Sequence, residues 1–233
     1  AGDRPDDPDW LRFRLVGMTN PAYFGLFARR RMAMYGDTQE DFARVKVKNS
    51  RHGVHNPNAR YPKEFNLADV ENSPVVSDPL RLLEICATSD GGAALVVSSM
   101  EYAKAHGHTD PVRVSGISTV GPMFPNAIID MPYLASDSWA AAGDEEHTFK
   151  DQIAQRAYDE AGVGPDDLDL AEVYDLSSAY ELDWYEHIGL CEPGDAAQLL
   201  RSGDTAVGGR IPVNTSGGLG AFGEAIPAQA IAQ

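Results

Sequence analysis

Short apolar runs alternate with helix-like segments along residues 82–173, and this alternation constrains the fold more than any other feature. The apolar runs have the length of strands that a sheet covers on both faces. The expected strands are 93–97, 112–120 and 168–173, and the expected helices run from Ser98 or Ser99 to Ala105 and from Thr148 to Ala161. Strands that alternate with helices in this way predict a layered α/β fold.

The first eighty residues are expected to be mainly helical. Apolar residues recur at helical spacing after Asn20, and Gly36 follows as a C-terminal stop. A second helix is expected over residues 39–49, because Thr38 can cap it and Asp41 stands where a capping box needs its acid. A helical part therefore precedes the alternating part.

The composition is that of a globular chain. Of its 233 residues, 43% are apolar, which is enough for a hydrophobic core. No stretch approaches the roughly 20 apolar residues of a membrane helix, and the polar first residues contain no signal-peptide core. We therefore expect a cytoplasmic protein that binds no membrane. Cys86 and Cys191 are the two cysteines, and no Cys/His spacing matches a zinc site, so no metal is expected.

Charge is distributed unevenly along the chain. Residues 1–63 contain twelve Lys or Arg against seven Asp or Glu, whereas the remainder contains seven against twenty-eight. The basic part predicts contact with an anionic group. A coenzyme A thioester fits better than nucleic acid, whose phosphate backbone the acidic remainder would repel. The alternative is that Arg29, Arg30 and Arg31 lie on a solvated helix face.

Tyr174 is the first candidate for a functional residue. It follows the expected strand 168–173, at the carboxyl end where open α/β sheets place their ligand sites, and its neighbour Asp175 is also polar. The alternative is that Tyr174 is a packed aromatic residue with a satisfied hydroxyl. In the following helix, Trp184 and His187 are expected to be packing or surface residues.

A Gly-rich loop near the C-terminus is the second candidate. Its glycines permit positive φ and close approach of the backbone to a ligand, and N–H groups at a helix start can hold an oxyanion. Such a loop is equally a common structural turn. The glycines are Gly217, Gly218, Gly220 and Gly223, and Glu224 is the ionisable group beside them. Neither Gly-rich nucleotide-binding motif is present, so no nucleotide cofactor is expected.

Four segments resemble thiolases of the sterol-carrier-protein type. Residues 86–94 (CATSDGGAA) are similar to that family's C-x-T-S-D-G-A-A-A turn, and residues 17–24, 56–59 and 77–83 are similar to its loop domain and the exit from it. The resemblance implies an incomplete thiolase-like layered α/β fold. Its expected parts are a mainly helical loop domain on the coenzyme A side at 1–80, the last strands and helix of the N-terminal half at 81–120, and a truncated C-terminal half at 121–233.

Two departures from that family bear on function. Where sterol-carrier-type thiolases read His-Asp-Cys-Phe, residues 174–177 read Tyr-Asp-Leu-Ser, and where they read Gly-His-Pro, residues 222–224 read Phe-Gly-Glu. Claisen chemistry needs those imidazoles to activate a cysteine and to hold the thioester oxygen. At both places the sequence instead resembles the thiolase-like lipid-transfer-protein aldolases of bacterial steroid side-chain degradation. That resemblance implies retro-aldol cleavage of a β-hydroxyacyl-CoA to a steroid ketone and propionyl-CoA.

The resemblance further implies a homodimer whose subunits each bind a small OB-fold partner, with no cofactor beyond the coenzyme A of the substrate. Tyr174 is expected to serve as an acid or base. A phenol with a pKa of about 10 is a poor base at neutral pH, so the site must stabilise the phenolate or use the hydroxyl as a donor. The other expected residues are Glu224 and Asp175 beside it, Asn214, Gly217, Gly218, Gly220 and Gly223 in an oxyanion loop, and Tyr133 in a lid over residues 121–146.

Two other functions stay open at this point. One is an acetyl-CoA acetyltransferase that uses a cysteine outside this segment, and a covalent acyl-enzyme would support it. The other is a non-catalytic subunit that binds lipid or acyl-CoA, and tight binding without turnover of any thioester would support it.

Overall fold

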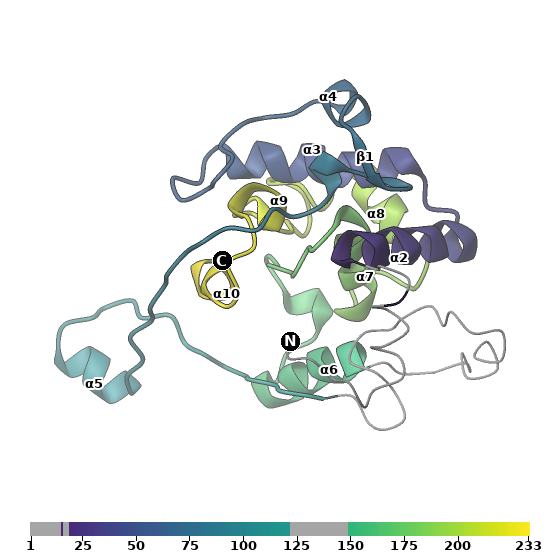
Figure 1. The fold of residues 1–233 in the computed structure, drawn as a ribbon. Coiled ribbons are helices and arrows are strands. Elements are labelled where there is room, and N and C mark those ends of the chain that lie inside the picture. Colours follow the sequence, from purple (N-terminus) through teal and green to yellow (C-terminus); the bar gives the residue numbers. More distant parts are fainter. Residues whose placement is uncertain (1–14, 16–18, 122–148) are drawn as a thin grey trace.

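The structure is a computed structural model that describes residues 15, 19–121 and 149–233 (Figure 1). Helices predominate in it. They are α2 (Asn20–Tyr35), α3 (Gln39–Gly53), α4 (Leu67–Glu71), α5 (Met100–Ala105), α6 (Phe149–Ala161), α7 (Ser178–His187), α8 (Ala196–Ser202), α9 (Gly218–Phe222) and α10 (Ala228–Ala232). Strands β1 (Val75–Ser77) and β2 (Leu80–Arg81) form an antiparallel pair, and short 3-10 turns lie at Leu82–Glu84 and Pro165–Asp167.

The two N-terminal helices confirm the capping signals. Helix α2 ends at Gly36, whose φ of 77° is the left-handed conformation that glycine adopts without strain. Helix α3 begins after Thr38, and the side chains of Thr38 and Asp41 form a reciprocal capping box. The second helix continues to Gly53, beyond the expected end at residue 49, because it packs along α7, α8 and α9 (Figure 1).

One hydrophobic core joins the N-terminal helices to the C-terminal part. Rings from α2 surround Tyr180 of α7, and Phe27 stacks on it with centroids 4.4 Å apart. The same core includes residues of segments 171–173 and 211–213. The expected division of the chain at residues 80 and 120 stays a prediction, since this core receives side chains from both sides of it.

The three expected strands are not formed. Among the described residues, the strand pairing near them is a single parallel bridge between Ala171 and Val213. Residues 93–97 and 112–120 lie in an extended arm that carries α5 away from the other helices (Figure 1). Val96 is 99% exposed there, because the described chain places no neighbouring strand beside it. A ladder needs a partner, so the apolar pattern alone does not produce a strand.

The alternative of a solvated helix face holds for Arg29 and Arg30, which are exposed, but not for Arg31. Its side chain is 2% exposed, donates to Asp37 at 2.7 Å and forms two hydrogen bonds with Glu186, at 2.9 and 2.7 Å. Because it joins α2 to α7 inside the protein, Arg31 is a structural residue. The exposed Arg29 pairs with Asp78.

Candidate active site

Three chain segments meet at the predicted site. Residues 85–89 run between the segment after Tyr174 and the end of α9, with bridges from Ile85 to Ser177 and from Thr88 to Glu224. Two backbone hydrogen bonds fix Glu224 to this middle segment: its N–H donates to the Ala87 carbonyl at 2.7 Å, and its carbonyl accepts from Ser89 at 2.9 Å. The two departures from the thiolase motifs are therefore brought together in space.

Tyr174 and Glu224 form a direct pair. The Tyr174 hydroxyl donates to Oε1 of Glu224, and both residues are half-buried. Burial and the adjacent Glu224 carboxylate raise the pKa of Tyr174 above its ordinary value. Tyr174 therefore keeps its proton at neutral pH, which favours the donor role over the phenolate.

Cys86 is the third side chain of the site. Its Sγ donates to Oε2 of Glu224 at 3.5 Å, so each oxygen of that carboxylate has one donor. Burial and Glu224 raise the pKa of the Cys86 thiol, which makes it a donor and a poor nucleophile. From the sequence, Cys86 was not predicted to be a residue of the site. The signal that could have found it is its place in the CATSDGGAA turn, which a thiolase-like fold brings to the same site.

The side chain of Asp175 points away from the Tyr174–Glu224 pair. Successive side chains of an extended segment point to opposite sides. Oδ1 of Asp175 accepts from the Leu219 N–H at 2.8 Å, and Oδ2 accepts from Asn49 at 3.2 Å. Burial and Glu181 raise its pKa. Asp175 is therefore a buried anchor for α9.

A buried polar network holds the segment before the Gly-rich loop. Asn214 is fully buried with a φ of 54°, and its side chain accepts from Val173 N–H and donates to Glu181, both at 2.8 Å. Its carbonyl accepts from Nδ1 of His52 at 2.9 Å. Nε2 of His52 accepts from Val207 N–H at 3.0 Å, so the proton lies on Nδ1. Asn214 therefore fixes the start of the loop.

The Gly-rich loop forms the short helix α9, which the sequence did not predict. Gly218 has a φ of 60°, and a Cβ there would lie 2.3 Å from Oδ2 of Asp175, so only glycine fits. Several loop N–H groups already donate within the protein: Gly217 to Asn214 O, Gly218 to Ser216 Oγ, Leu219 to Asp175 and Gly223 to Leu219 O. An oxyanion role for this loop stays a prediction, and it requires such donors to be released.

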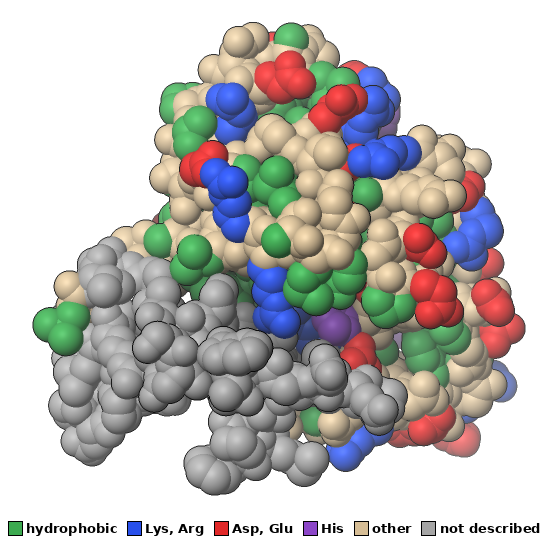
Figure 2. Space-filling view, turned by 90° about the vertical axis from the view of Figure 1, so that its right-hand side faces the viewer, with side chains coloured by type: hydrophobic (Ala, Val, Ile, Leu, Met, Phe, Trp, Pro, Cys, Tyr) green, Lys and Arg blue, Asp and Glu red, His purple; other side chains and the backbone are tan. Residues whose placement is uncertain are grey.

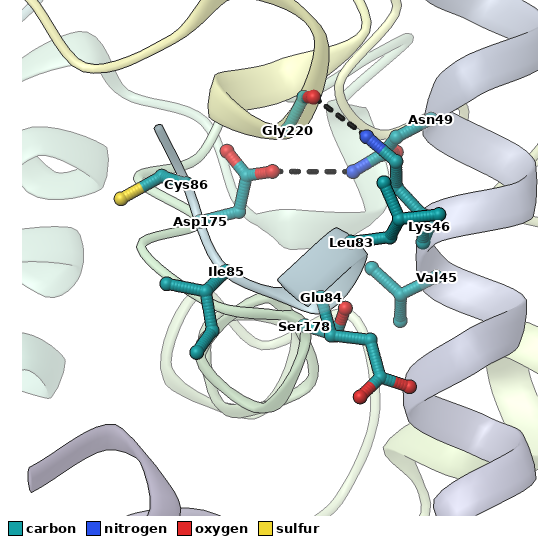
Figure 3. A pocket seen from close by; sticks show the side chains of 10 residues that line it. All are labelled: Val45, Lys46, Asn49, Leu83, Glu84, Ile85, Cys86, Asp175, Ser178 and Gly220. Atoms are coloured by element: carbon teal, nitrogen blue, oxygen red, sulfur yellow. Dashed lines mark hydrogen bonds between the residues drawn. The ribbon is translucent and has the colours of Figure 1, made fainter. Parts of the chain in front are cut away.

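A small cavity of about 10 Å³, the room of one water molecule, lies between α3, α9 and Asp175 (Figure 3). Lys46 and Asn49 reach across it from α3, toward the Gly220 carbonyl and Asp175 respectively (Figure 3). Cys86 also lines it, so the cavity adjoins the site. Within residues 19–121 and 149–233, no group of His, Cys, Asp and Glu side chains is arranged to hold a metal ion.

One face of the molecule shows Lys and Arg intermingled with Asp and Glu (Figure 2). This face therefore offers no continuous basic patch to a polyanion. None of the described helices is long and apolar enough to span a membrane.

Comparison with known proteins identifies the family. A family model for the thiolase C-terminal domain matches residues 136–233. A solved structure, the Ltp2-ChsH2(DUF35) aldolase, superposes with a TM-score of 0.80 at 31% identity, over all of this chain and 60% of that one. This chain belongs to the thiolase superfamily. The prediction of an incomplete thiolase-like α/β fold is thereby confirmed, and the described residues contribute helices and one small two-stranded sheet to it.

Three curated relatives of the superfamily differ in what their names describe. Benzoylsuccinyl-CoA thiolase subunit BbsB of Thauera aromatica is 35% identical over 90% of this chain, and sterol carrier protein 2 of Rattus norvegicus is 33% identical over 91%. The steroid side-chain-cleaving aldolase of Thermomonospora curvata is 35% identical over 87%. This chain spans only 51%, 38% and 50% of these relatives.

The remaining predicted residues include one outside the described part of the chain. Tyr133 and most of the expected lid fall outside the described residues. His187 contacts Asp151 and Asp183, which makes it part of an ion network between α6 and α7. Trp184 has a role that the sequence did not predict, since its Nε1 donates to the Tyr174 carbonyl at 3.2 Å. It thereby supports the segment that carries the tyrosine.

Proposed function

We propose that this chain acts in a thiolase-like aldolase, a carbon-carbon lyase that cleaves a β-hydroxyacyl-CoA to a ketone and propionyl-CoA. The observation that carries the proposal is the hydrogen bond between Tyr174 and Glu224. Tyr174 stands where one thiolase motif has histidine, and Glu224 directly follows Gly223, which stands where the other motif has histidine. A neutral phenol beside a carboxylate is suited to moving protons. The relatives whose names say aldolase support the same reaction class.

In the proposed mechanism, the Glu224 carboxylate acts as the base. It takes the proton of the β-hydroxyl, the oxygen electrons form the carbonyl of the ketone, and the bond between the α- and β-carbons breaks. The electron pair of that bond passes into the thioester enolate. Because Glu224 and Tyr174 are half-buried, a substrate has access to both side chains.

Tyr174 completes the proton balance as the acid. Its hydroxyl gives a proton to the α-carbon of the enolate, which yields propionyl-CoA and a phenolate. The protonated Glu224 then returns its proton to Tyr174 along their hydrogen bond. No proton is gained or lost over the cycle, and the reaction needs no cofactor besides the coenzyme A of its substrate.

The finer features of the proposal come from the relatives. We propose a steroid side chain as the acyl group, because one aldolase relative is named for that reaction. A partner protein is proposed because the similar Ltp2-ChsH2(DUF35) aldolase is named for two proteins. Its small OB-fold and a homodimer of this chain are proposed from the resemblance to the thiolase-like aldolases. Light scattering of the purified chain, alone and with such a partner, measures both associations. We place the reaction in the cytoplasm, as the sequence predicts.

The proposal is tested by supplying two thioesters to the chain and its partner. Release of propionyl-CoA and a ketone from a β-hydroxyacyl-CoA is expected, and acetyl-CoA should leave no covalent adduct by intact mass spectrometry. An acetyl adduct would favour the acetyltransferase, which the thiolase relative supports. Tight binding of both thioesters without turnover would favour a non-catalytic lipid- or acyl-CoA-binding subunit.

A further inference from the structure

Lys46 ends inside the protein between α3 and α9. Its side chain is 5% exposed, and its Nζ donates to the Gly220 carbonyl at 2.6 Å and lies 5.2 Å from the centroid of the Phe65 ring. In the part of the chain that the structure describes, Lys46 forms no ion pair, although a buried ammonium group is usually paired. This amine has no part in the proposed proton transfer.

Helix α9 depends on such outside contacts. It has five residues, fewer than an isolated helix needs for stability, and its last carbonyls lack partners within the helix. The Leu219 carbonyl accepts from Gly223 N–H at 2.8 Å, and the Ala221 carbonyl accepts from Tyr61 N–H at 3.0 Å. The Gly220 carbonyl accepts from Lys46, so this side chain attaches the C-terminal end of α9 to α3.

We propose that Lys46 is a positioning residue for the acid/base pair, because its amine holds α9 against α3 and α9 leads directly into Glu224. Asp175 attaches the other end of α9 through the Leu219 N–H. The catalytic consequence rests on the proposed function, but the attachment of α9 can be measured without any substrate.

The titration of Lys46 gives this attachment a distinctive pH dependence. Burial lowers the pKa of Lys46 to about 8, whereas an exposed lysine has a pKa of about 10.4. The attached state therefore favours the neutral amine, which still donates to Gly220. Attachment of α9 should strengthen as pH rises from about 8 to about 10, because the detached state then binds more protons.

Between about pH 8 and about pH 10, the other titratable groups of the cavity either weaken the attachment of α9 or leave it unchanged. Burial raises the pKa of Glu84 to about 7 and raises that of Asp175, so ionisation of either carboxyl weakens the attached state. The Cys86 thiol, whose pKa is raised, stays neutral. Lys63 lies over the same Phe65 ring, but its side chain is exposed. Attachment of α9 that strengthens above pH 8 is therefore the effect expected of Lys46 and not of these other groups.

Hydrogen exchange followed by mass spectrometry measures the attachment directly. Protection factors, which correct for the intrinsic pH dependence of exchange, are compared at pH 8 and pH 9.5 for the peptide 217–224, with α7 as the internal reference. In the wild-type chain we expect protection of this peptide to rise about tenfold over the interval. Protection of α7 should stay constant.

Three variants separate charge from hydrogen bonding. Lys46→Arg keeps its charge throughout, so protection should stay low and independent of pH. Lys46→Met has neither charge nor donor, so protection should also be independent of pH, and about fivefold below the wild-type value at pH 9.5. Lys63→Met is the matched control and should keep the wild-type rise.

Two results would overturn the proposal: wild-type protection that stays flat or falls with pH, or a Lys46→Met variant with the wild-type rise. If the chain cleaves a β-hydroxyacyl-CoA, Lys46→Met should lower kcat with little change in KM, while Lys63→Met keeps the wild-type kcat. An unchanged kcat in Lys46→Met would overturn the positioning role even if α9 loosens. Absence of cleavage by the wild type would refute the proposed function and leave the exchange result standing.

Discussion

Two Tyr–Glu pairs occur among the described residues, and their surroundings differ. In the interior, Tyr185 donates to Glu181 at 2.5 Å, and both side chains are fully buried. At the candidate active site, Tyr174 donates to Glu224, and both are half-buried. The same hydrogen bond is therefore made in a closed and in an accessible environment.

The partners of the two carboxylates explain the difference. Glu181 also forms an ion pair with Lys48 at 2.6 Å, which neutralises its charge. It accepts hydrogen bonds from Asn49 at 2.5 Å and Asn214 at 2.8 Å, so its oxygens have a full set of donors. Among the side chains of the described residues, only Tyr174 and Cys86 donate hydrogen bonds to the Glu224 carboxylate. A carboxylate with unused lone pairs and solvent access can accept a substrate proton, whereas a saturated buried one holds structure.

Removing the interior carboxylate should have the largest effect on stability. Glu181→Ala leaves the Lys48 ammonium buried without a counter-charge, and we expect the free energy of unfolding to fall by about 3–5 kcal/mol. Urea denaturation monitored by circular dichroism measures the change. Glu224→Ala is the control, with an expected loss of about 1 kcal/mol or less. Equal losses for the two variants would mean that the pairs do not differ as described.

Removing only the hydroxyl of each pair should give a smaller contrast. Tyr185→Phe takes one donor from a fully buried carboxylate, so we expect a stability loss of about 1–3 kcal/mol. Tyr174→Phe should cost less than about 1 kcal/mol, since water can replace the donor at a half-exposed oxygen. Thermal unfolding of both variants checks this order. A larger loss for Tyr174→Phe would contradict it.

Asp175 lies between the two pairs, because Asn49 donates to both Asp175 and Glu181. Gly218→Ala should disturb it, since the new Cβ would meet the Asp175 carboxylate in addition to straining a φ of 60°. The strain alone is worth about 1–2 kcal/mol. Gly162→Ala is the matched control, with a φ of 71° and nothing within 4 Å of its Cβ. Equal unfolding free energies for the two variants would show that α9 shifts freely away from Asp175.

The smallest effect is expected at Cys86. Its protonated thiol supplies a weak donor to Glu224, so Cys86→Ala should lower the rate of cleavage by less than about tenfold. Steady-state kinetics with a β-hydroxyacyl-CoA measure it, with Cys191→Ala as the control. A loss beyond a thousandfold would assign Cys86 a direct chemical role.

The sequence predicted helices α2, α3, α5 and α6, because their caps and apolar spacing are local signals. It also predicted the meeting of Tyr174 with Glu224, because the motif resemblance includes the thiolase fold. It did not predict that Asp175 turns inward, since that direction is set by Leu219 and Asn49 across the fold. The strand expected over residues 93–97 failed for a related reason. An apolar pattern favours burial, but a strand also needs a neighbouring strand, and the described residues place none beside 93–97.

The most direct test of the account is the cleavage rate of a β-hydroxyacyl-CoA by Tyr174→Phe and Glu224→Gln, with Tyr185→Phe assayed in parallel. Loss of an acid or base group should lower kcat by about 10²–10⁴ in the first two variants, with each still folded by circular dichroism. Tyr185→Phe should retain the activity of its folded fraction. Wild-type turnover by folded Tyr174→Phe or Glu224→Gln would contradict the assignment of this pair as the acid and the base.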